Sequence, residues 1–390
     1  MKRIKKHIAG FVVAAMAVLC SIGIMVGEEA HAGEPTPSGS GIATWSELQA
    51  ALNAGGEVTL SQDITASSGD SALIIPSNAT VTLDLNGHTI DRGLYRKSES
   101  GEVTVDDPQD NGYVIKIEGS LTLEDSSDNA DTPEYDGTGM ITGGNNTNYG
   151  GGVYAEGSFI MNGGMISGNT ARYGGGVHLD QCVADIMGGI ISGNVASEGG
   201  GISVRNSAWL RISDCAISNN SADLGAGVYV DNHSDLYLEG GKISENNATS
   251  YGGGVYLCVS MGYKSEIYVS GSVIISGNVR GGSFTSGTLS GGTADNLYLP
   301  DGLMVGVTGT LTGSIGITKG TEDGSGDFAY GASGHQLTDA DISKFTGDDS
   351  RFIPAKDGNT GKLVIIPWLD LSEKFETASS DSGAPTEIKL

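Results

Sequence analysis

The sequence predicts an all-β fold built from stacked repeats, and three observations support that prediction. Glycine supplies 63 of the 390 residues without a three-residue period, which excludes collagen and indicates many tight turns. A Gly-Gly-Gly or Gly-Ala-Gly motif returns with its third glycine at 152, 176, 201, 227 and 254, and an Ile-Ser motif keeps nearly the same spacing. A period of about 25 residues without helical periodicity is typical of a β-solenoid.

Each repeat has room for three short strands joined by tight turns, so one repeat forms one coil. If the coils stack, parallel strands about 4.8 Å apart place equivalent residues in columns. Apolar residues alternate with polar ones, and no single repeat can bury its apolar face alone. Four interior columns are predicted: Val153, Val177, Ile202, Val228 and Val255; Phe159, Ala184, Leu210, Leu236 and Ile267; Met161, Ile186, Ile212, Leu238 and Val269; and the isoleucine series from Ile141 to Ile275.

A column of asparagines is predicted at the corner where each Ile-Ser-Gly-Asn motif ends. Stacked amides can hydrogen-bond from one coil to the next, as they do in amide ladders. The glycines around this corner allow positive φ or a close approach of backbones. The five asparagines are Asn169, Asn194, Asn220, Asn246 and Asn278.

The first 32 residues are typical of a secretory signal peptide. A basic start is followed by an apolar run over residues 8–26 and by an Ala-x-Ala site that ends at Ala32. We expect cleavage after Ala32, with a retained membrane anchor as the alternative. The mature protein is then secreted or held at the cell surface, and no further segment is apolar enough to span a membrane.

The rest of the chain has a helical start, a repetitive middle and an irregular end. Thr44 and Glu47 form a capping box for a short helix, which is suited to cover the open end of a stacked core. The predicted segments are a signal peptide at 1–32, a flexible leader at 33–42, an N-terminal cap at 43–70, the β-helix at 71–318, a C-terminal cap at 319–368 and a polar tail at 369–390.

The charge of the chain restricts its partners. Lys and Arg number 21 against 47 Asp and Glu, a formal net charge of −26. Such a surface repels nucleic acid and anionic membranes and favours solubility. We therefore expect no nucleic-acid partner, and we expect a monomer.

The motifs resemble a known family. The segments "TVTLDLNGHTI", "SLTLEDSS" and the repeated "YGGGVY…GGMISGNTA" look like the right-handed parallel β-helix proteins, often adhesin-like, that Gram-positive bacteria export. The resemblance covers roughly residues 43–365 and implies a single right-handed β-helix of the pectate-lyase-like superfold. It also implies a surface protein whose partner is a glycan or a protein of a host or neighbouring cell. The chain lacks the LPxTG-type sorting signal of anchored members.

Catalytic motifs of the superfold are absent or misplaced in the sequence. No column of aspartates accompanies the basic residues of the coils, as a calcium-dependent polysaccharide lyase requires. The polygalacturonase series is incomplete, because Asn-Thr-Asp does not occur. We therefore expect a non-enzymatic binding module. A polysaccharide lyase or glycoside hydrolase is one alternative, and a purely structural spacer is another.

One acidic insertion is a weak candidate for calcium. Asp125, Asp128 and Asp131 lie close together, and carboxylate oxygens are the ligands that calcium prefers. Their spacing matches no EF-hand, so a solvated acidic loop is the preferred interpretation. Apart from calcium, no cofactor or metal is expected.

Two rows of outward side chains are the candidate binding residues. Tyr154, His178, Tyr229 and Tyr256 stand beside the first interior column, whereas Tyr237 and Tyr268 stand beside the second. Exposed aromatic rows can stack on sugar rings or contact a protein. The alternative is that the rings only stack on one another and stabilise the sheet.

Overall fold

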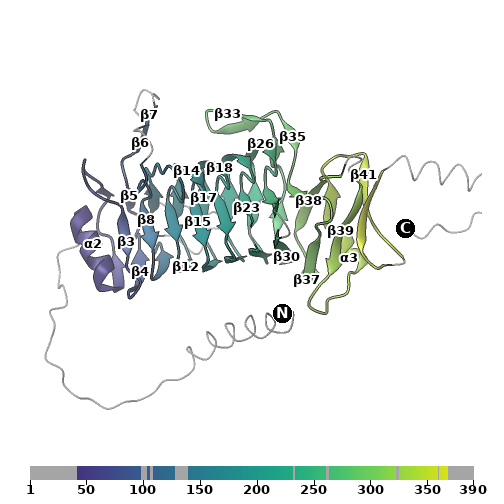
Figure 1. Cartoon of the computed structure of the whole chain (residues 1–390), viewed down its shortest axis with the longest axis horizontal. Coiled ribbons are helices and arrows are strands. Elements are labelled where there is room, and N and C mark those ends of the chain that lie inside the picture. Colours follow the sequence, from purple (N-terminus) through teal and green to yellow (C-terminus); the bar gives the residue numbers. More distant parts are fainter. Residues whose placement is uncertain are drawn as a thin grey trace, which may run out of the picture. The chain divides into compact units, whose positions relative to one another are not determined.

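The computed structural model describes residues 42–97, 103–105, 109–127, 139–231, 233–260, 263–321, 325–358 and 360–367. Within them the chain is mostly β-strand arranged in long parallel sheets, which is compatible with a β-helix (Figure 1). The predicted signal peptide with its cleavage point after Ala32, the leader up to residue 41 and the tail at 369–390 lie outside the described residues.

The first sheet has twelve strands, and most of its members come one from each repeat. Its parallel part carries alternating buried and half-exposed residues, since one face packs on the core. In spatial order the strands are β1 (Gly56–Thr59), β4 (Thr80–Asp84), β9 (Ser120–Glu124), β12 (Ser158–Met161), β16 (Val183–Ile186), β20 (Trp209–Ile212), β24 (Asp235–Leu238), β30 (Glu266–Gly271), β37 (Val305–Leu311), β39 (Gly326–Gly331), β42 (Leu363–Pro367) and β41 (Phe352–Lys356).

The second sheet contains two parallel ladders that meet at β38 (Ser314–Lys319). One ladder is β3 (Leu73–Ile75), β8 (Ile115–Ile117), β11 (Val153–Ala155), β15 (Val177–Asp180), β19 (Ile202–Arg205), β23 (Val228–Val230), β27 (Val255–Leu257) and β36 (Leu297–Leu299). The other is β2 (Ile64–Thr65), β5 (Thr89–Asp91), β10 (Met140–Thr142), β13 (Met165–Ser167), β17 (Ile190–Ser192), β21 (Ala216–Ser218), β25 (Lys242–Ser244) and β31 (Ile274–Ile275). Beyond β38 lies β40 (Phe345–Gly347).

A third sheet was not expected from the sequence, so the prediction of three strands per coil is wrong for the regular repeats. The repeat that starts with β11 continues through β12, β13 and a fourth strand, β14. Its pattern is weak because the buried side chains are small, namely Ala171, Ala222 and Ala248. The third sheet is β14 (Thr170–Tyr173), β18 (Val195–Glu198), β22 (Ser221–Leu224), β26 (Asn247–Tyr251), β32 (Val279–Arg280) and β35 (Thr293–Ala294).

The predicted interior columns are confirmed pair by pair. Val153 is in register with Val177, and this ladder continues one repeat at a time to Val255 and Leu297. The columns through Phe159 and Ile141 show the same one-to-one register. These side chains are essentially inaccessible to solvent and belong to one continuous core. Burial of this apolar surface is the main stabilising contribution.

The asparagine ladder is also confirmed. The Oδ1 atom of Asn220 accepts from Asn194 N at 3.0 Å and from Asn194 Nδ2 at 3.1 Å, and its Nδ2 donates to Asn246 Oδ1 at 3.0 Å. The same pattern links the other asparagines and continues past Asn278 to Asn296. Asp348 ends the ladder, since its two carboxylate oxygens accept from Asn296 N and Nδ2, both at 2.6 Å.

Both ends of the described stack carry other structure. Helix α2 (Trp45–Ala54) has the predicted capping box, buries Leu48 and Leu52, and lies against β3 (Figure 1). Trp45 Nε1 donates to the Ser71 carbonyl at 2.8 Å. At the other end, α3 (Asp339–Ile342) contacts β37 and β41. Three antiparallel hairpins interrupt the repeats: β6 (Tyr95–Lys97) with β7 (Val103–Val105), β28 (Val259–Ser260) with β29 (Tyr263–Lys264), and β33 (Ser283–Thr285) with β34 (Thr288–Ser290).

Neither helix of the described segments has the length and apolar character that crossing a membrane requires.

Candidate functional site

The first predicted row of outward side chains has the predicted strand-to-strand register. The prediction that all of its members are exposed is wrong for two of them. Tyr154, His178, Ser203, Tyr229 and Tyr256 follow one another from strand to strand along the β11 ladder. His178 is completely buried and Tyr229 is only 3% exposed, whereas Tyr154 and Tyr256 are partly exposed. The row is therefore covered along its middle by other parts of the chain.

The cover over His178 comes from the tyrosines that precede two of the glycine corners. The φ of Gly174 is +67°, and a side chain on this residue would meet the Val177 carbonyl oxygen at 2.2 Å. This turn brings Tyr173 back beside the next strand, with its ring centroid 6.4 Å from that of His178. Tyr149 occupies the same place one repeat earlier and lies 4.8 Å from His178. These corner tyrosines cover His178, whereas Arg205 and Tyr256 lie against Tyr229.

Together the two sets of rings form a continuous band, which we call the tyrosine strip. Its members are Tyr149, Tyr154, Tyr173, Tyr229, Tyr251, Tyr256 and Tyr298. Successive rings within its two clusters have centroids 4.7 to 5.7 Å apart, within the range of favourable aromatic contact. Tyr149 and Tyr251 are the most accessible large side chains of the strip, each 41% exposed. The strip therefore presents tyrosine side chains to solvent in more than one repeat.

Arg205 joins the two clusters of rings. Its guanidinium carbon lies 4.3 Å from the Tyr173 ring centroid and 4.7 Å from that of Tyr229. It also pairs with Glu198 and with Asp231, the latter at 3.6 Å. A guanidinium that is stacked and paired in this way is held in place between the Tyr173 and Tyr229 rings, so it continues the stack from one cluster to the other.

The ionisable groups of the strip are arranged to remain in one protonation state. Burial, followed by the charge of Arg205, lowers the pKa of His178 to about 3, so its imidazole is neutral at physiological pH. Neither ring nitrogen of His178 has a hydrogen-bond partner among the described residues. Burial raises the pKa of Tyr256 to about 12 and raises that of Tyr154, whose hydroxyl donates to Glu156 at 2.6 Å. The strip is therefore a stacking surface with hydrogen-bonding edges.

The second predicted row lies on the outer face of the first sheet. Tyr237 and Tyr268 are paired in register on neighbouring strands, and their ring centroids are 4.7 Å apart. The ring centroid of Trp209 lies 5.2 Å from that of Tyr237. The Tyr268 ring also lies over Gly306, where any added side chain carbon would be 2.7 Å from it. All three aromatic residues are partly exposed. This row is shorter than the tyrosine strip and lies on a different sheet.

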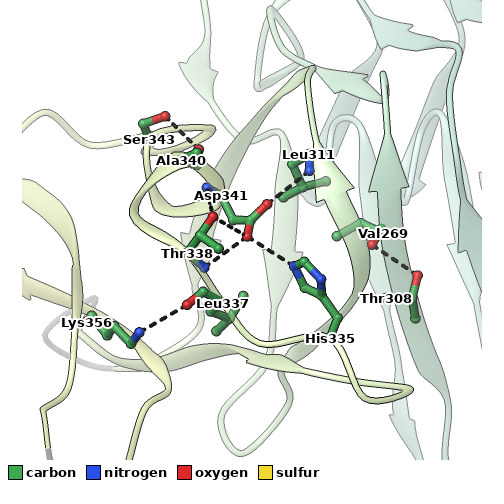
Figure 2. Close-up of polar contacts among 10 residues, drawn as sticks. All are labelled: Val269, Thr308, Leu311, His335, Leu337, Thr338, Ala340, Asp341, Ser343 and Lys356. Atoms are coloured by element: carbon green, nitrogen blue, oxygen red, sulfur yellow. Dashed lines mark hydrogen bonds and ion pairs between the residues drawn. The ribbon is translucent and has the colours of Figure 1, made fainter.

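A histidine–aspartate pair lies in the C-terminal segment, but among the described residues no serine donates to the histidine as a catalytic triad would require. His335 Nε2 is 3.0 Å from Asp341 Oδ2, which also accepts from Thr338 N and Oγ1 (Figure 2). Burial opposes ionisation of Asp341, but hydrogen bonds from Leu311, Thr338 and His335 together lower its pKa to about 2. Ser343 Oγ donates to the Ala340 carbonyl instead of to the histidine. Asp341 therefore connects α3 to β37, because its Oδ1 accepts from Leu311 N at 3.0 Å.

The calcium candidate Asp125 is engaged with backbone and hydroxyl donors. Its Oδ1 accepts from Gly87 N and Ser127 Oγ, both at 2.7 Å, and its Oδ2 accepts from Gly139 N at 2.8 Å. Asp128 and Asp131 lie outside the described residues. Within the part of the chain that the structure describes, no group of three His, Cys, Asp or Glu residues is placed to hold a metal.

Sequence reasoning missed the corner residues of the strip. Tyr149, Tyr173 and Tyr251 each stand directly before a triple glycine, so the recurrent motif Tyr-Gly-Gly-Gly was the available signal. Tyr298 follows an interruption of the period and carries no such signal.

Comparison with known proteins provides no assignment, because the chain matches no protein-family model, no curated protein and no solved structure.

Proposed function

We propose that the chain is an exported, single right-handed parallel β-helix that binds a glycan along the tyrosine strip without cleaving it. The observation that carries this proposal is the strip itself. Its rings and the Arg205 guanidinium follow one another in a continuous stack, with Tyr149 and Tyr251 each 41% exposed to solvent. The apolar faces of sugar rings stack on such surfaces, and polar edges bind their hydroxyl groups.

The stacking geometry supports the β-helix part of the proposal. Four strand positions recur in each regular repeat, and each pairs with its counterpart in the next repeat in parallel. A chain that returns to the same position once per repeat follows a coil, and parallel crossovers are nearly always right-handed. The predicted signal peptide at 1–32 and the net negative charge of the chain support secretion or display at the cell surface.

Charged pairs at the edges of the strip support a polar ligand. Lys116 Nζ lies 5.4 Å from the Tyr154 ring centroid and pairs with Glu118 at 3.0 Å and Glu156 at 2.9 Å. Because Lys116 is already matched by these two carboxylates, this edge offers donors and acceptors with little net charge. Such an edge suits the hydroxyl groups of a sugar.

Glycan binding by the full chain tests the proposal, with Tyr149→Ala and Tyr251→Ala as variants. A glycan array identifies an oligosaccharide ligand, and calorimetric titration measures its Kd for each variant. Loss of one stacked ring removes about 1 to 1.5 kcal/mol, so we expect each variant to bind roughly tenfold more weakly. Each side chain is 41% exposed and also covers a neighbouring ring, so the melting temperature of each variant is measured to separate lost binding from lost stability.

Tyr237→Ala is the matched control, because this partly exposed tyrosine lies on the first sheet. We expect it to bind the oligosaccharide like the unaltered chain. Loss of binding in Tyr237→Ala with none in the strip variants would move the site to the second row and contradict the proposal. Binding to cell-surface proteins but to no glycan would contradict it as well.

A further inference from the structure

A cavity of about 500 Å³ lies among strands β32, β35 and β38 and the segment that follows β40. This volume is within the range of small-ligand sites. Two buried apolar side chains, Ile317 and Ile365, belong to its lining. Four lining residues carry hydroxyl groups: Thr293, Thr318, Thr321 and Ser350. Apolar walls with a few polar groups can hold a small ligand in a fixed orientation.

The cavity continues the tyrosine strip. Thr318, which lines the cavity, is in register with Tyr298, the last ring of the β11 ladder. The hydroxyl group of Tyr298 also lies over Gly320, where an added side-chain carbon would be 2.6 Å from it. Gly320 stands between two lining residues, Lys319 and Thr321. A linear ligand that lies along the strip toward Tyr298 therefore reaches the cavity with its end.

The two guanidinium groups of the cavity are already matched by carboxylates. Asp349 binds Arg351 through both carboxylate oxygens, which lie 3.0 and 2.9 Å from Arg351 Nε. Arg280 Nε lies 4.0 Å from a carboxylate oxygen of Asp295. Burial raises the pKa of Asp295 to about 6, so this carboxylate is mostly ionised at neutral pH. Each guanidinium therefore has a counterion within the protein, and neither needs an anionic ligand.

The other two charged residues of the lining, Lys319 and Asp348, are engaged as well. Lys319 Nζ donates to the Leu303 carbonyl at 3.1 Å, and both carboxylate oxygens of Asp348 accept from Asn296 at 2.6 Å. The lining and Asp295 together contribute three cations and three carboxylates, so their formal charge is zero. A charged ligand would lose its hydration without gaining an opposite charge, whereas an uncharged polar ligand needs only hydrogen bonds.

We propose that this cavity binds the terminal residue of the glycan and that this residue is an uncharged sugar. Its hydroxyl groups bind the threonine and serine side chains and the paired ions, since a guanidinium has several N–H donors and a carboxylate several acceptor positions. Its apolar face packs on Ile317 and Ile365. The inference rests on the proposed function, since the rest of the glycan lies on the tyrosine strip.

Calorimetric titration of the full chain with single sugars at pH 7 tests the cavity alone. The probes are glucose, galactose and mannose, each beside its uronic acid, which is an anion, and its 6-amino-6-deoxy derivative, which is a cation. We expect at least one neutral sugar to bind at least ten times more tightly than both of its charged derivatives. A smaller preference for all of the neutral sugars, or no binding of any of them, would overturn the proposal.

Asp349→Asn locates the binding, because it breaks the charge balance of the cavity. The side chains of Asp349 and Arg351 are 38% and 79% exposed, so we expect the variant to fold. With Arg351 no longer matched by a carboxylate, the uronic acid of the preferred sugar should bind at least ten times more tightly than it binds the unaltered chain. Unchanged binding of the uronic acid would refute the site.

Glu118→Gln is the matched control for this variant. It also removes a partly exposed carboxylate from an ion pair, but its partner Lys116 lies beside Tyr154 at the other end of the strip. The control should leave the affinity for the uronic acid unchanged. An equal gain in both variants would indicate a general charge effect and contradict the location of the site.

Tyr149→Ala separates this inference from the proposed function. Tyr149 lies in the repeat of Tyr154, five register steps from Tyr298. The variant should weaken oligosaccharide binding while it leaves binding of the single neutral sugar unchanged. Oligosaccharide binding that depends on Tyr149, in a protein that binds none of the single sugars, would overturn the cavity alone. Binding of the single neutral sugar with no strip dependence for any oligosaccharide would overturn the proposed function alone.

Discussion

Replacement of one ladder asparagine by alanine is the sharpest test of how the stack is held together. Asn220 is completely buried, and its side chain makes four hydrogen bonds. Its Nδ2 donates to the Ile191 carbonyl at 2.9 Å and to Asn246 Oδ1 at 3.0 Å. Its Oδ1 accepts from Asn194 N at 3.0 Å and from Asn194 Nδ2 at 3.1 Å. Asn220→Ala removes all four.

The expected loss follows from this count. A buried intramolecular hydrogen bond contributes about 1 kcal/mol net, so four contribute about 4 kcal/mol. The variant also leaves the buried Asn194 N–H without its acceptor, and an unpaired buried N–H is itself destabilising. We expect the free energy of unfolding to fall by roughly 3 to 5 kcal/mol. Urea denaturation of the full chain, followed by circular dichroism, measures this change as a lower midpoint.

Asn162→Ala is the matched control for this experiment. Asn162 is an exposed asparagine directly after β12, and its Nδ2 makes one bond, to Glu124 Oε1 at 3.1 Å. Its loss should cost at most about 0.5 kcal/mol, as for most surface substitutions. If both variants unfold at the same urea concentration, the ladder does not stabilise the fold and the reasoning is refuted.

Three further predictions concern packing, pH and activity. Gly227→Ala should destabilise by about 3 kcal/mol, because its Cβ would lie 2.4 Å from the Gly254 carbonyl oxygen, while Gly358→Ala, in open space, should keep the urea midpoint. Because the pKa of Asp341 is lowered to about 2, its ionised form should contribute roughly 2 kcal/mol of stability above pH 4, and the protein should lose this contribution as the pH falls toward 2. Asp341→Asn should not show this loss when its unfolding is followed against pH. An identical acid profile for the variant and the unaltered chain would contradict the prediction. Incubation with polygalacturonate and calcium should yield no unsaturated product, and its appearance would identify a lyase.

The repeat made much of the fold predictable. Residues one period apart become neighbours in any stacked arrangement, so Val153 over Val177 and Asn194 over Asn220 followed from spacing alone. The capping box at Thr44 was equally local, since both of its partners lie within one helical turn. Periodicity therefore determined which residues meet their own equivalents.

The fourth strand of each repeat escaped prediction because its core is too small to show in the sequence. Ala171 and Ala222 are buried there, and alanine gives a weak alternation compared with valine or isoleucine. The end of the asparagine ladder at Asp348 could not be predicted for another reason. Asp348 lies 52 residues beyond Asn296, after the period has been lost, so no spacing connects them.

For the candidate site, the sequence by itself determined which tyrosines stand in a row, because Tyr154, Tyr229 and Tyr256 occupy equivalent positions in the repeat. Only the tertiary structure decided which of these rings solvent can reach. Exposure depends on contacts between different positions of the repeat, such as Tyr149 against His178 and Arg205 against Tyr229. The first contact follows from the positive φ of Gly150, which turns the chain at Tyr149 onto its own outer face, and the second follows from the stacking of β19 against β23.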